Sequence, residues 1–200
     1  MTKFDDVVEA WQQADVQHIH PLRTVSEDAY WKSGQVQAHF AASWFDKGSK
    51  VMDFGCGDGR LAIPLAGMDF EVVAVDSSPA MLDRVRKRAK KMDVELTTVK
   101  SDGRDLSKKV KGKVDGIVCR AVLIHHDYEG VEALVKAFAS VLKKGGHLVA
   151  DWPLADRARP HERRDWIDVT TWEPKQRLAV AEAAGLAPVG DETPSVWVKL

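Results

Sequence analysis

Three glycines at alternate positions follow an apolar run and carry the strongest chemical signal in the sequence. The run 51–54 (VMDF) leads directly into Gly55, Gly57 and Gly59. Glycine has no Cβ, so the chain can turn sharply here and a ligand can come close to the backbone amides. A glycine-rich turn directly after a strand therefore predicts a binding site for a large ligand.

A carboxylate follows the next apolar run. Asp76 lies 17 residues beyond Gly59, directly after the run 71–75 (EVVAV). An acid at the end of the second strand of an α/β unit can accept hydrogen bonds from both hydroxyls of a ribose. Together the two features predict an adenosine-containing ligand at the carboxyl ends of parallel strands.

The glycine spacing separates two classes of adenosine ligand. A dinucleotide loop has the spacing G-x-G-x-x-G, in which a helix N-terminus meets the pyrophosphate, whereas this loop has G-x-G-x-G. Asp53 stands two residues before Gly55, and its carboxylate repels phosphate but can organise a cationic amino group. An amino acid joined to adenosine is S-adenosylmethionine, so we expect this ligand rather than NAD and a dehydrogenase.

Short apolar runs alternate with helical patterns, which is typical of a parallel sheet covered by helices. We expect strands over 50–54, 71–75, 94–99, 114–119 and 146–151, and helices over 59–67, 78–92 and 130–143, the last ending at Gly145–Gly146. A helical segment over 26–46 precedes them. A helix over 177–185 and two short strands near 186–190 and 195–200 follow, and we expect this last pair to form an antiparallel edge.

Composition limits the class of protein. The 200 residues fit one domain, and 29 basic against 30 acidic side chains leave a formal charge of −1, which gives no general attraction for polyanions. Apolar stretches are shorter than the roughly 20 residues of a membrane span, and the start MTKFDDVVEAW is unlike a signal peptide. Two cysteines, Cys56 and Cys119, suit a reducing compartment. We expect a cytoplasmic protein without a membrane or nucleic-acid partner.

Residues 51–59 resemble the glycine motif of the class I S-adenosylmethionine-dependent methyltransferases. Further segments resemble motifs of that family in the same order: 72–82 (VVAVDSSPAML), 101–106 (SDGRDL), 114–126 (VDGIVCRAVLIHH) and 142–152 (LKKGGHLVADW). The resemblance implies a doubly wound, Rossmann-like α/β sandwich with a mostly parallel seven-stranded sheet and an antiparallel last strand. It also implies one domain, comprising a helical cap (1–48), a cofactor-binding core (49–151) and an acceptor-side segment with the last strands (152–200).

The resemblance assigns roles to individual residues. Asp53, Gly55, Cys56, Gly57 and Gly59 are expected at the methionine part of the cofactor, Asp76 at the ribose, with Ser77 and Met81 beside it, Asp102 and Gly103 at the adenine, and Arg120 and Ala121 along the cofactor. Tyr30, Trp31 and Gly34 resemble a W-x-S-G segment that closes over the methionine carboxylate, so Trp31 is also expected to bind the cofactor.

Methyl transfer is an in-line displacement, so the enzyme positions the acceptor and, where needed, removes its proton. His125 and His126 follow the fourth strand, where cofactor and acceptor should meet, and histidine has a suitable pKa near 6.5. We expect one of them, preferably His126, to be the general base; the alternative is that they pack or cap a helix. His18 and His20 lack carboxylates at ligand spacing, and we expect no metal site.

The acceptor is expected to be a small molecule. The segment after strand four lacks the Asn- or Asp-Pro-Pro-aromatic run of family members that methylate exocyclic amines of bases. Basic and aromatic residues that suit an acidic or aromatic acceptor occur over 152–173, namely Trp152, Arg157, Arg159, Arg163, Arg164, Trp166 and Trp172. An RNA or protein methyltransferase, and a catalytically silent S-adenosylmethionine-binding protein, remain alternatives.

Overall fold

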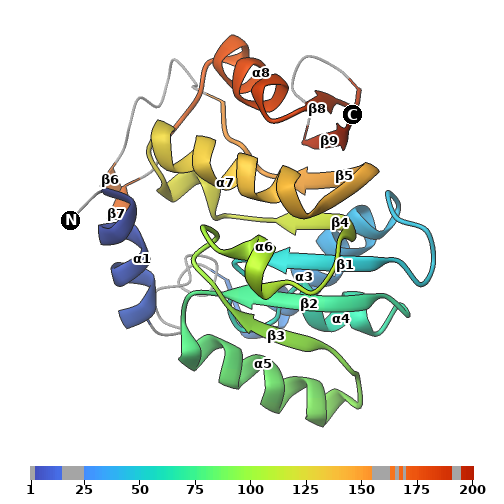
Figure 1. The fold of residues 1–200 in the computed structure, drawn as a ribbon. Coiled ribbons are helices and arrows are strands. Elements are labelled where there is room, and N and C mark those ends of the chain that lie inside the picture. Colours follow the sequence, from blue (N-terminus) through green and yellow to red (C-terminus); the bar gives the residue numbers. More distant parts are fainter. Residues whose placement is uncertain (1–2, 15–24, 155–162, 165–166, 169, 191–194) are drawn as a thin grey trace.

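The sheet at the centre of the molecule has seven strands in the order β3-β2-β1-β4-β5-β9-β8 (Figure 1). A computed structural model describes residues 3–14, 25–154, 163–164, 167–168, 170–190 and 195–200. The strands are β1 (Lys50–Phe54), β2 (Glu71–Asp76), β3 (Thr97–Lys100), β4 (Val114–Cys119), β5 (Leu142–Ala150), β8 (Leu186–Pro188) and β9 (Val196–Lys199). Neighbours are parallel except where β9 pairs with β5 and β8.

Helices cover both faces of this sheet. They are α1 (Lys3–Gln13), α3 (Glu27–Ala42), α4 (Ala62–Ala66), α5 (Pro79–Met92), α6 (Leu106–Lys109), α7 (Tyr128–Val141) and α8 (Pro174–Ala183), with a 3-10 turn η2 (Leu123–His125). Helices α3, α4 and α5 pack on one face and α6, α7 and α8 on the other. A separate two-stranded ribbon is formed by β6 (Arg163–Arg164) and β7 (Ile167–Asp168).

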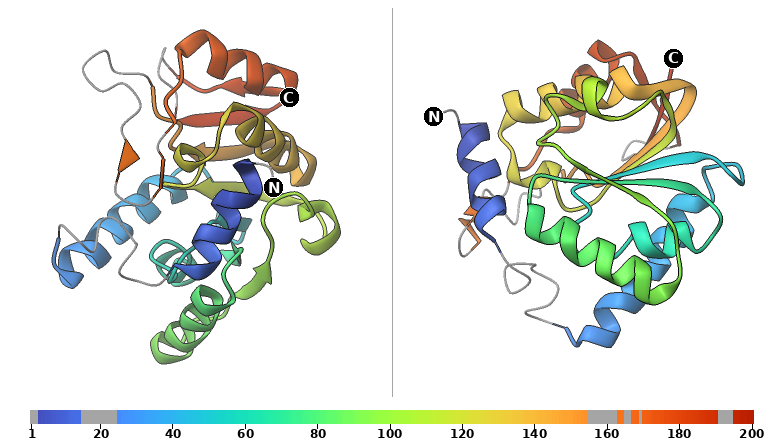
Figure 2. Two further views of the ribbon diagram at one scale, coloured as in Figure 1. Left: turned by 90° about the vertical axis from the view of Figure 1, so that its left-hand side faces the viewer. Right: turned by 60° about the horizontal axis from the view of Figure 1, so that its bottom comes forward.

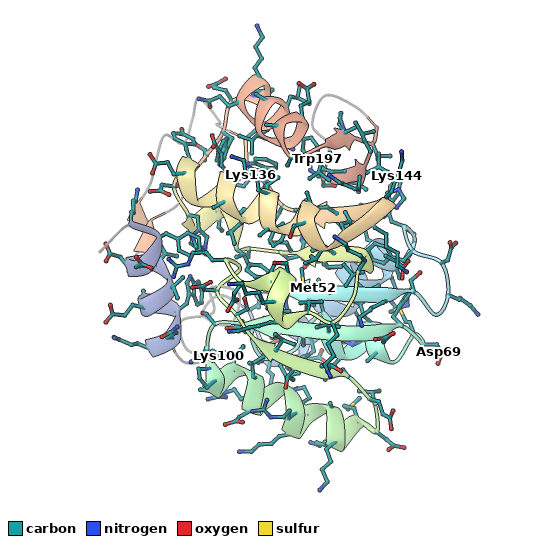
Figure 3. The ribbon with its side chains drawn as sticks, viewed as in Figure 1. Met52, Asp69, Lys100, Lys136, Lys144 and Trp197 are labelled. Carbon is teal, nitrogen blue, oxygen red and sulfur yellow. The ribbon has the colours of Figure 1, made fainter. Side chains whose placement is uncertain are left out.

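The sheet divides the interior into two cores. Successive side chains of a strand point to opposite faces, so Met52 contributes to the core beneath α7, whereas its neighbour Val51 contributes to the core beneath α4. Both residues are fully buried. Figure 3 labels Met52 and Trp197, which are buried, and Lys136 of α7, whose side chain is exposed. Burial on both faces explains why these strands are nearly continuous apolar runs.

Helix α1 lies across the sheet edge formed by the carboxyl ends of the parallel strands (Figure 2, left). Two capped helices begin at the same edge. Ser78 caps α5 by accepting a hydrogen bond from the Met81 amide (3.4 Å), and Asp127 caps α7 by accepting one from the Gly130 amide (2.9 Å). These caps fix where the loops after β2 and β4 end.

The predicted fold class is confirmed, while several predicted boundaries were wrong. Helix α7 begins at Tyr128, because Asp127 rather than Gly130 is its cap, and ends at Val141. Strand β5 then begins at Leu142 and includes Gly145–Gly146, which were expected to end the helix. Strands β8 and β9 are antiparallel as predicted, but β9 lies inside the sheet and only β8 is at the edge.

Shorter elements also differ from the sequence expectation. The region 94–99 was predicted as a strand, but pairing with β2 starts only at Thr97. The region 59–67 contains a helix only over Ala62–Ala66, since the glycine loop extends into its first residues. Within the described residues, no helix combines the length and apolar character needed to cross a membrane.

Candidate functional site

A cavity lies at the carboxyl ends of β1, β2, β3 and β4, beneath α1. The structure brings to its wall most of the residues predicted to bind a cofactor or act in catalysis. These are Asp53, Gly55, Cys56, Gly57, Asp76, Ser77, Met81, Asp102, Arg120, Ala121 and His126. Residues from four separate segments of the sequence therefore meet at one edge of the sheet.

Four other predicted residues do not line this cavity. Gly59 and Gly103 lie behind its wall, where a Cβ would meet Ile63 and Leu134, respectively. Trp31 stacks instead on the guanidinium of Arg88, with the Arg88 Cζ 3.6 Å from its ring centroid. His125 lies beside Trp11 of α1, with 5.2 Å between the ring centroids.

Asp76 holds the glycine loop against the end of β2. Its carboxylate accepts hydrogen bonds from the Gly57 amide (2.9 Å) and the Ser78 amide (2.8 Å). Burial raises the pKa of this carboxyl, and the backbone donors, Ser78 first, oppose the rise. Each carboxylate oxygen can accept more than one hydrogen bond, so the side chain can brace the loop and still accept bonds from a ligand in the cavity.

Gly57 leaves free space at the bend of the loop. Its φ is +52°, and a Cβ built there has no heavy atom within 4 Å. At Gly55, by contrast, a Cβ would come within 2.2 Å of the Val122 Cγ2 atom. The missing side chain at Gly57 therefore leaves open space at a residue that lines the cavity, whereas that at Gly55 allows the loop to pack on the protein.

Asp53 offers a buried acceptor without a partner. The residue is only 3% exposed, and its Oδ2 atom makes no hydrogen bond. Burial raises the pKa of the carboxyl to about 7, although a backbone hydrogen bond from Ala62 and the nearby charge of Arg60 oppose the rise. An unpaired carboxylate oxygen is costly, and a cationic ligand group at this wall would satisfy it.

Asp102, on the cavity wall after β3, is linked to α1 through Arg104. Its carboxylate accepts hydrogen bonds from the Arg104 amide (3.0 Å) and from the Arg104 guanidinium (3.0 and 2.6 Å). The same guanidinium pairs with Asp5 of α1 at 2.9 Å and lies over the Phe4 ring. The acid expected at the adenine thus shares its cationic partner with the helix above it.

Helix α1 supplies part of the cavity wall that the sequence interpretation missed. Val7, Val8 and Trp11 face the cavity, and the Phe4 ring lies 4.7 Å from the ring of His126. These apolar residues recur at helical spacing, so a signal for the helix is present in the sequence. Its place over the cavity depends on contacts with distant residues and has no local signal.

Helix α3 packs against the glycine loop. The Tyr30 hydroxyl, buried, donates a hydrogen bond to Asp58 Oδ1 (2.8 Å), and Arg60 lies over the Tyr30 ring. A Cβ at Gly34 would come within 2.4 Å of the Arg60 Cγ atom, which shows how closely α3 approaches the loop. Burial and the neighbouring Asp58 charge raise the pKa of Tyr30, so its phenol stays protonated.

His126 is a neutral imidazole in this environment. It is 5% exposed, and its Nδ1 atom has no hydrogen-bond partner. Burial lowers the pKa of the ring to about 4, with the neighbouring His125 adding to the effect. Among the described residues, no group of three or more His, Cys, Asp or Glu side chains is arranged to hold a metal ion.

Comparisons with known proteins agree with this geometry. A family model described as a methyltransferase domain matches residues 51–146. Ubiquinone biosynthesis O-methyltransferase of Xanthomonas campestris pv. campestris (strain B100) is 28% identical over 150 residues, covering 74% of this chain and 58% of that protein. Magnesium protoporphyrin IX methyltransferase from Synechocystis PCC 6803, solved with bound SAM, matches 100% of this chain and 98% of its own with a TM-score of 0.72 and 18% identity. The chain therefore contains a methyltransferase domain over residues 51–146.

Another similar solved structure supports the fold but identifies no substrate for this methyltransferase. Streptomyces venezuelae DesVI matches 94% of this chain and 100% of its own, with a TM-score of 0.68 and 19% identity. At such identities the solved structures establish the fold alone. The chain spans less than two thirds of the length of the curated relative from Xanthomonas campestris, 58%, so that similarity does not establish the substrate or the partners.

The tryptophans expected at an acceptor site belong to the core of this methyltransferase. Trp152 and Trp172 are 3% and 2% exposed, and with Trp197 they form a cluster in which the Arg177 guanidinium lies over two of the rings. The prediction for these two tryptophans was wrong, because aromatic composition suits a core as well as a pocket. Arg157, Arg159 and Trp166 lie outside the described residues, as do the side chains of Arg163 and Arg164.

Proposed function

We propose that this methyltransferase uses S-adenosylmethionine to methylate a small-molecule acceptor. The unpaired, buried Oδ2 atom of Asp53 beside the open bend at Gly57 carries the proposal. A ligand that presents an ammonium group to the acid and a slender chain to the glycine matches both features. When bound, S-adenosylmethionine supplies an electrophilic methyl group.

The residues of the cavity wall then divide into four roles. Asp53 and Gly57 hold the amino-acid part, Asp76 and Ser77 hold the ribose, and Asp102 accepts a hydrogen bond from the adenine amino group. His126, which is neutral above about pH 4, can accept a proton from the acceptor as a general base. These assignments follow the order of the loops along the sheet edge.

Isothermal titration with S-adenosylmethionine, S-adenosylhomocysteine and NAD tests the cofactor. We expect the two sulfur ligands to bind and NAD to give no heat of binding, because a carboxylate at Asp53 repels phosphate. Binding of NAD alone, or of none of the three, would contradict the proposal. Tight binding of the sulfur ligands without turnover on any acceptor would favour a catalytically silent binding protein.

Cofactor binding should release a proton from Asp53. In the empty site the pKa of this carboxyl is about 7, so at pH 6 most molecules carry the proton. A bound ammonium favours the carboxylate and lowers that pKa. Affinity for S-adenosylmethionine should therefore rise between pH 5 and pH 7, by up to about tenfold per pH unit, and level off above the pKa of the empty site.

Titrations in buffers of different ionisation enthalpy measure this proton directly. Below pH 7 the ligand's own α-amino group stays protonated, so a proton released there comes from the protein. Asn at position 53 cannot ionise, and the D53N variant should lose both the proton release and the pH slope. A slope that persists in D53N would assign the proton to another group.

Replacing His126 by alanine should lower turnover by roughly 100-fold, a typical contribution of a general base. Affinity for the cofactor should change little, because the cofactor's polar groups are assigned to other residues. In the wild type at saturating S-adenosylmethionine, kcat/KM for the acceptor should fall as the pH is lowered toward 4, since burial has lowered the pKa of this histidine to about 4. The measurement is a pH–rate profile with an acceptor found by screening.

The H39A variant is a matched control, because His39 is an exposed histidine of α3, outside the cavity. It should retain wild-type turnover. H125A separates the two neighbouring candidates, and a larger loss in H125A than in H126A would transfer the role of base. Equal turnover in H126A and the wild type would leave His126 as a packing residue under Phe4.

The remaining expectations are also proposals. A small-molecule acceptor is supported by the curated relative, named as an O-methyltransferase of ubiquinone biosynthesis, and by the near-neutral charge of −1, which disfavours RNA. A cytoplasmic location is supported by Cys56 and Cys119, which are free and buried. The division into a helical cap over 1–48, a cofactor core over 49–151 and an acceptor-side segment over 152–200 is supported by the contact of α3 with the glycine loop.

A further inference from the structure

The loop after β4 faces a part of the cavity that the cofactor assignments leave unused. The cofactor roles proposed above go to residues that follow β1, β2 and β3, whereas Arg120 and Ala121, which the family resemblance places along the cofactor, follow β4. Strand β4 pairs with β5, and Cys119 lies opposite Ala150 in the register. The next residues of the two strands, Arg120 and Asp151, therefore stand side by side at the carboxyl edge. Arg120 lines the cavity.

The guanidinium of Arg120 is incompletely paired. Its Nε atom is buried and makes no hydrogen bond. The Asp151 Oδ2 atom lies 3.9 Å from this Nε, beyond hydrogen-bond distance. Both carboxylate oxygens of Asp151 instead accept the Ala121 amide, at 2.6 and 2.8 Å. Asp151 thus lowers the local positive charge without occupying the Nε donor.

The other arginine on the described part of the cavity wall differs from Arg120 in this respect. Arg60 donates to the Ser33 hydroxyl at 2.9 Å and to the Gln37 side chain at 2.8 Å. It also lies close enough to Asp53 to influence that carboxyl. Arg60 therefore directs its donors to side chains of α3, whereas the Nε donor of Arg120 has no hydrogen-bond partner.

The backbone holds Arg120 in a fixed position. Ala121, the next residue, has a φ of +56°, a conformation that residues with a Cβ rarely adopt. The Asp151 carboxylate holds the Ala121 amide in this conformation. Strained residues persist where surrounding contacts over-determine them, commonly at ligand sites. The turn thus presents Arg120 at a defined place on the cavity wall.

Part of the wall of this cavity is apolar. Val122 lies two residues after Arg120 in the sequence, and Val7, Val8 and Trp11 of α1 form the roof of the same cavity. A flat apolar molecule can pack against such walls, and a guanidinium fork matches the two oxygens of a carboxylate. We infer that Arg120 binds a carboxylate of the methyl acceptor, so that the acceptor belongs to the aromatic carboxylic acids. The inference rests on the proposed methyltransferase function.

Binding to the S-adenosylhomocysteine complex tests the inference without a need for turnover. The probes are benzoate, 4-hydroxybenzoate and 3,4-dihydroxybenzoate, each paired with its primary amide, which has a similar shape and no charge. We expect at least one acid to bind at least tenfold more tightly than its amide. In R120M this preference should disappear, and in R120K, which keeps the charge without the fork, part of it should remain.

Each other outcome is decisive. Equal affinity for acids and amides, no binding of any acid, or a preference that survives in R120M would overturn the inference. Loss of S-adenosylhomocysteine affinity in folded R120M would also overturn it, by assigning Arg120 to the cofactor. R84M, which changes an exposed arginine of α5, is the control and should behave as the wild type. Failure of the wild type to bind S-adenosylhomocysteine would instead reject the proposed function.

Discussion

Replacing Gly57 by alanine is expected to weaken S-adenosylmethionine binding by roughly 100-fold while the fold persists. A Cβ at this position meets no heavy atom of the protein within 4 Å, so it projects into open space at the bend of the loop. That space is assigned to the cofactor, and overfilling a close-packed contact costs about 3 kcal/mol, or two decades of affinity. Titration calorimetry measures the loss.

Gly48 provides a matched control for backbone strain. Its φ is +74°, its Cβ would likewise meet nothing within 4 Å, and it lies between α3 and β1, outside the cavity. Both alanine variants should lose about 1–2 kcal/mol of unfolding free energy from the left-handed conformation. G48A should bind the cofactor normally. Equal binding losses in the two variants, or wild-type affinity in G57A, would show that no ligand approaches the loop at Gly57.

The second large effect is expected at Asp76. The D76A variant removes a carboxylate that is assigned to the ribose hydroxyls and that also holds the Gly57 amide. Loss of one or two charge-assisted hydrogen bonds, each worth roughly 1.5–3 kcal/mol, should weaken cofactor binding by about 100-fold or more. Calorimetry with S-adenosylhomocysteine gives the affinity, and amide hydrogen exchange at Gly57 reports the state of the loop.

Two further variants separate the functions of this carboxylate. D76N keeps one oxygen acceptor and should lie between D76A and the wild type. D83A removes an exposed acid of α5 and should leave the affinity unchanged. If D76A binds the cofactor as tightly as the wild type, Asp76 only braces the loop and the ribose assignment fails.

The sheet and its binding edge could be predicted from the sequence because local signals agree there. Apolar strands buried on both faces, such as Val51–Phe54, are recognisable as continuous runs, and the glycine loop directly follows one of them. Asp76 could be placed in the same way, because it directly follows the apolar run of β2. Strand order then brings Asp53, Asp76 and Asp102 to one cavity without further information.

The parts that could not be predicted depend on contacts between distant segments. Helix α1 has an apolar face, but contacts with distant residues, such as the Phe4–His126 ring contact and the Asp5–Arg104 pair, place it over the cavity. Trp31 was assigned to the cofactor from a local pattern, whereas Arg88 of α5 provides its partner. The sequence around a tryptophan does not tell whether its ring will contact a ligand or another part of the protein.

The position of β9 constrains the order in which the sheet can assemble. Strand β9 pairs with β5 on one side and β8 on the other, although β8 precedes it in the chain. During synthesis β8 therefore emerges before the strand that joins it to the rest of the sheet. Pairing of β9 with β5 joins residues far apart in the sequence, so it requires closure of a long loop and is slow. The parallel strands β1 to β5 can pair first, and β8 waits unpaired until residues 196–199 have been made.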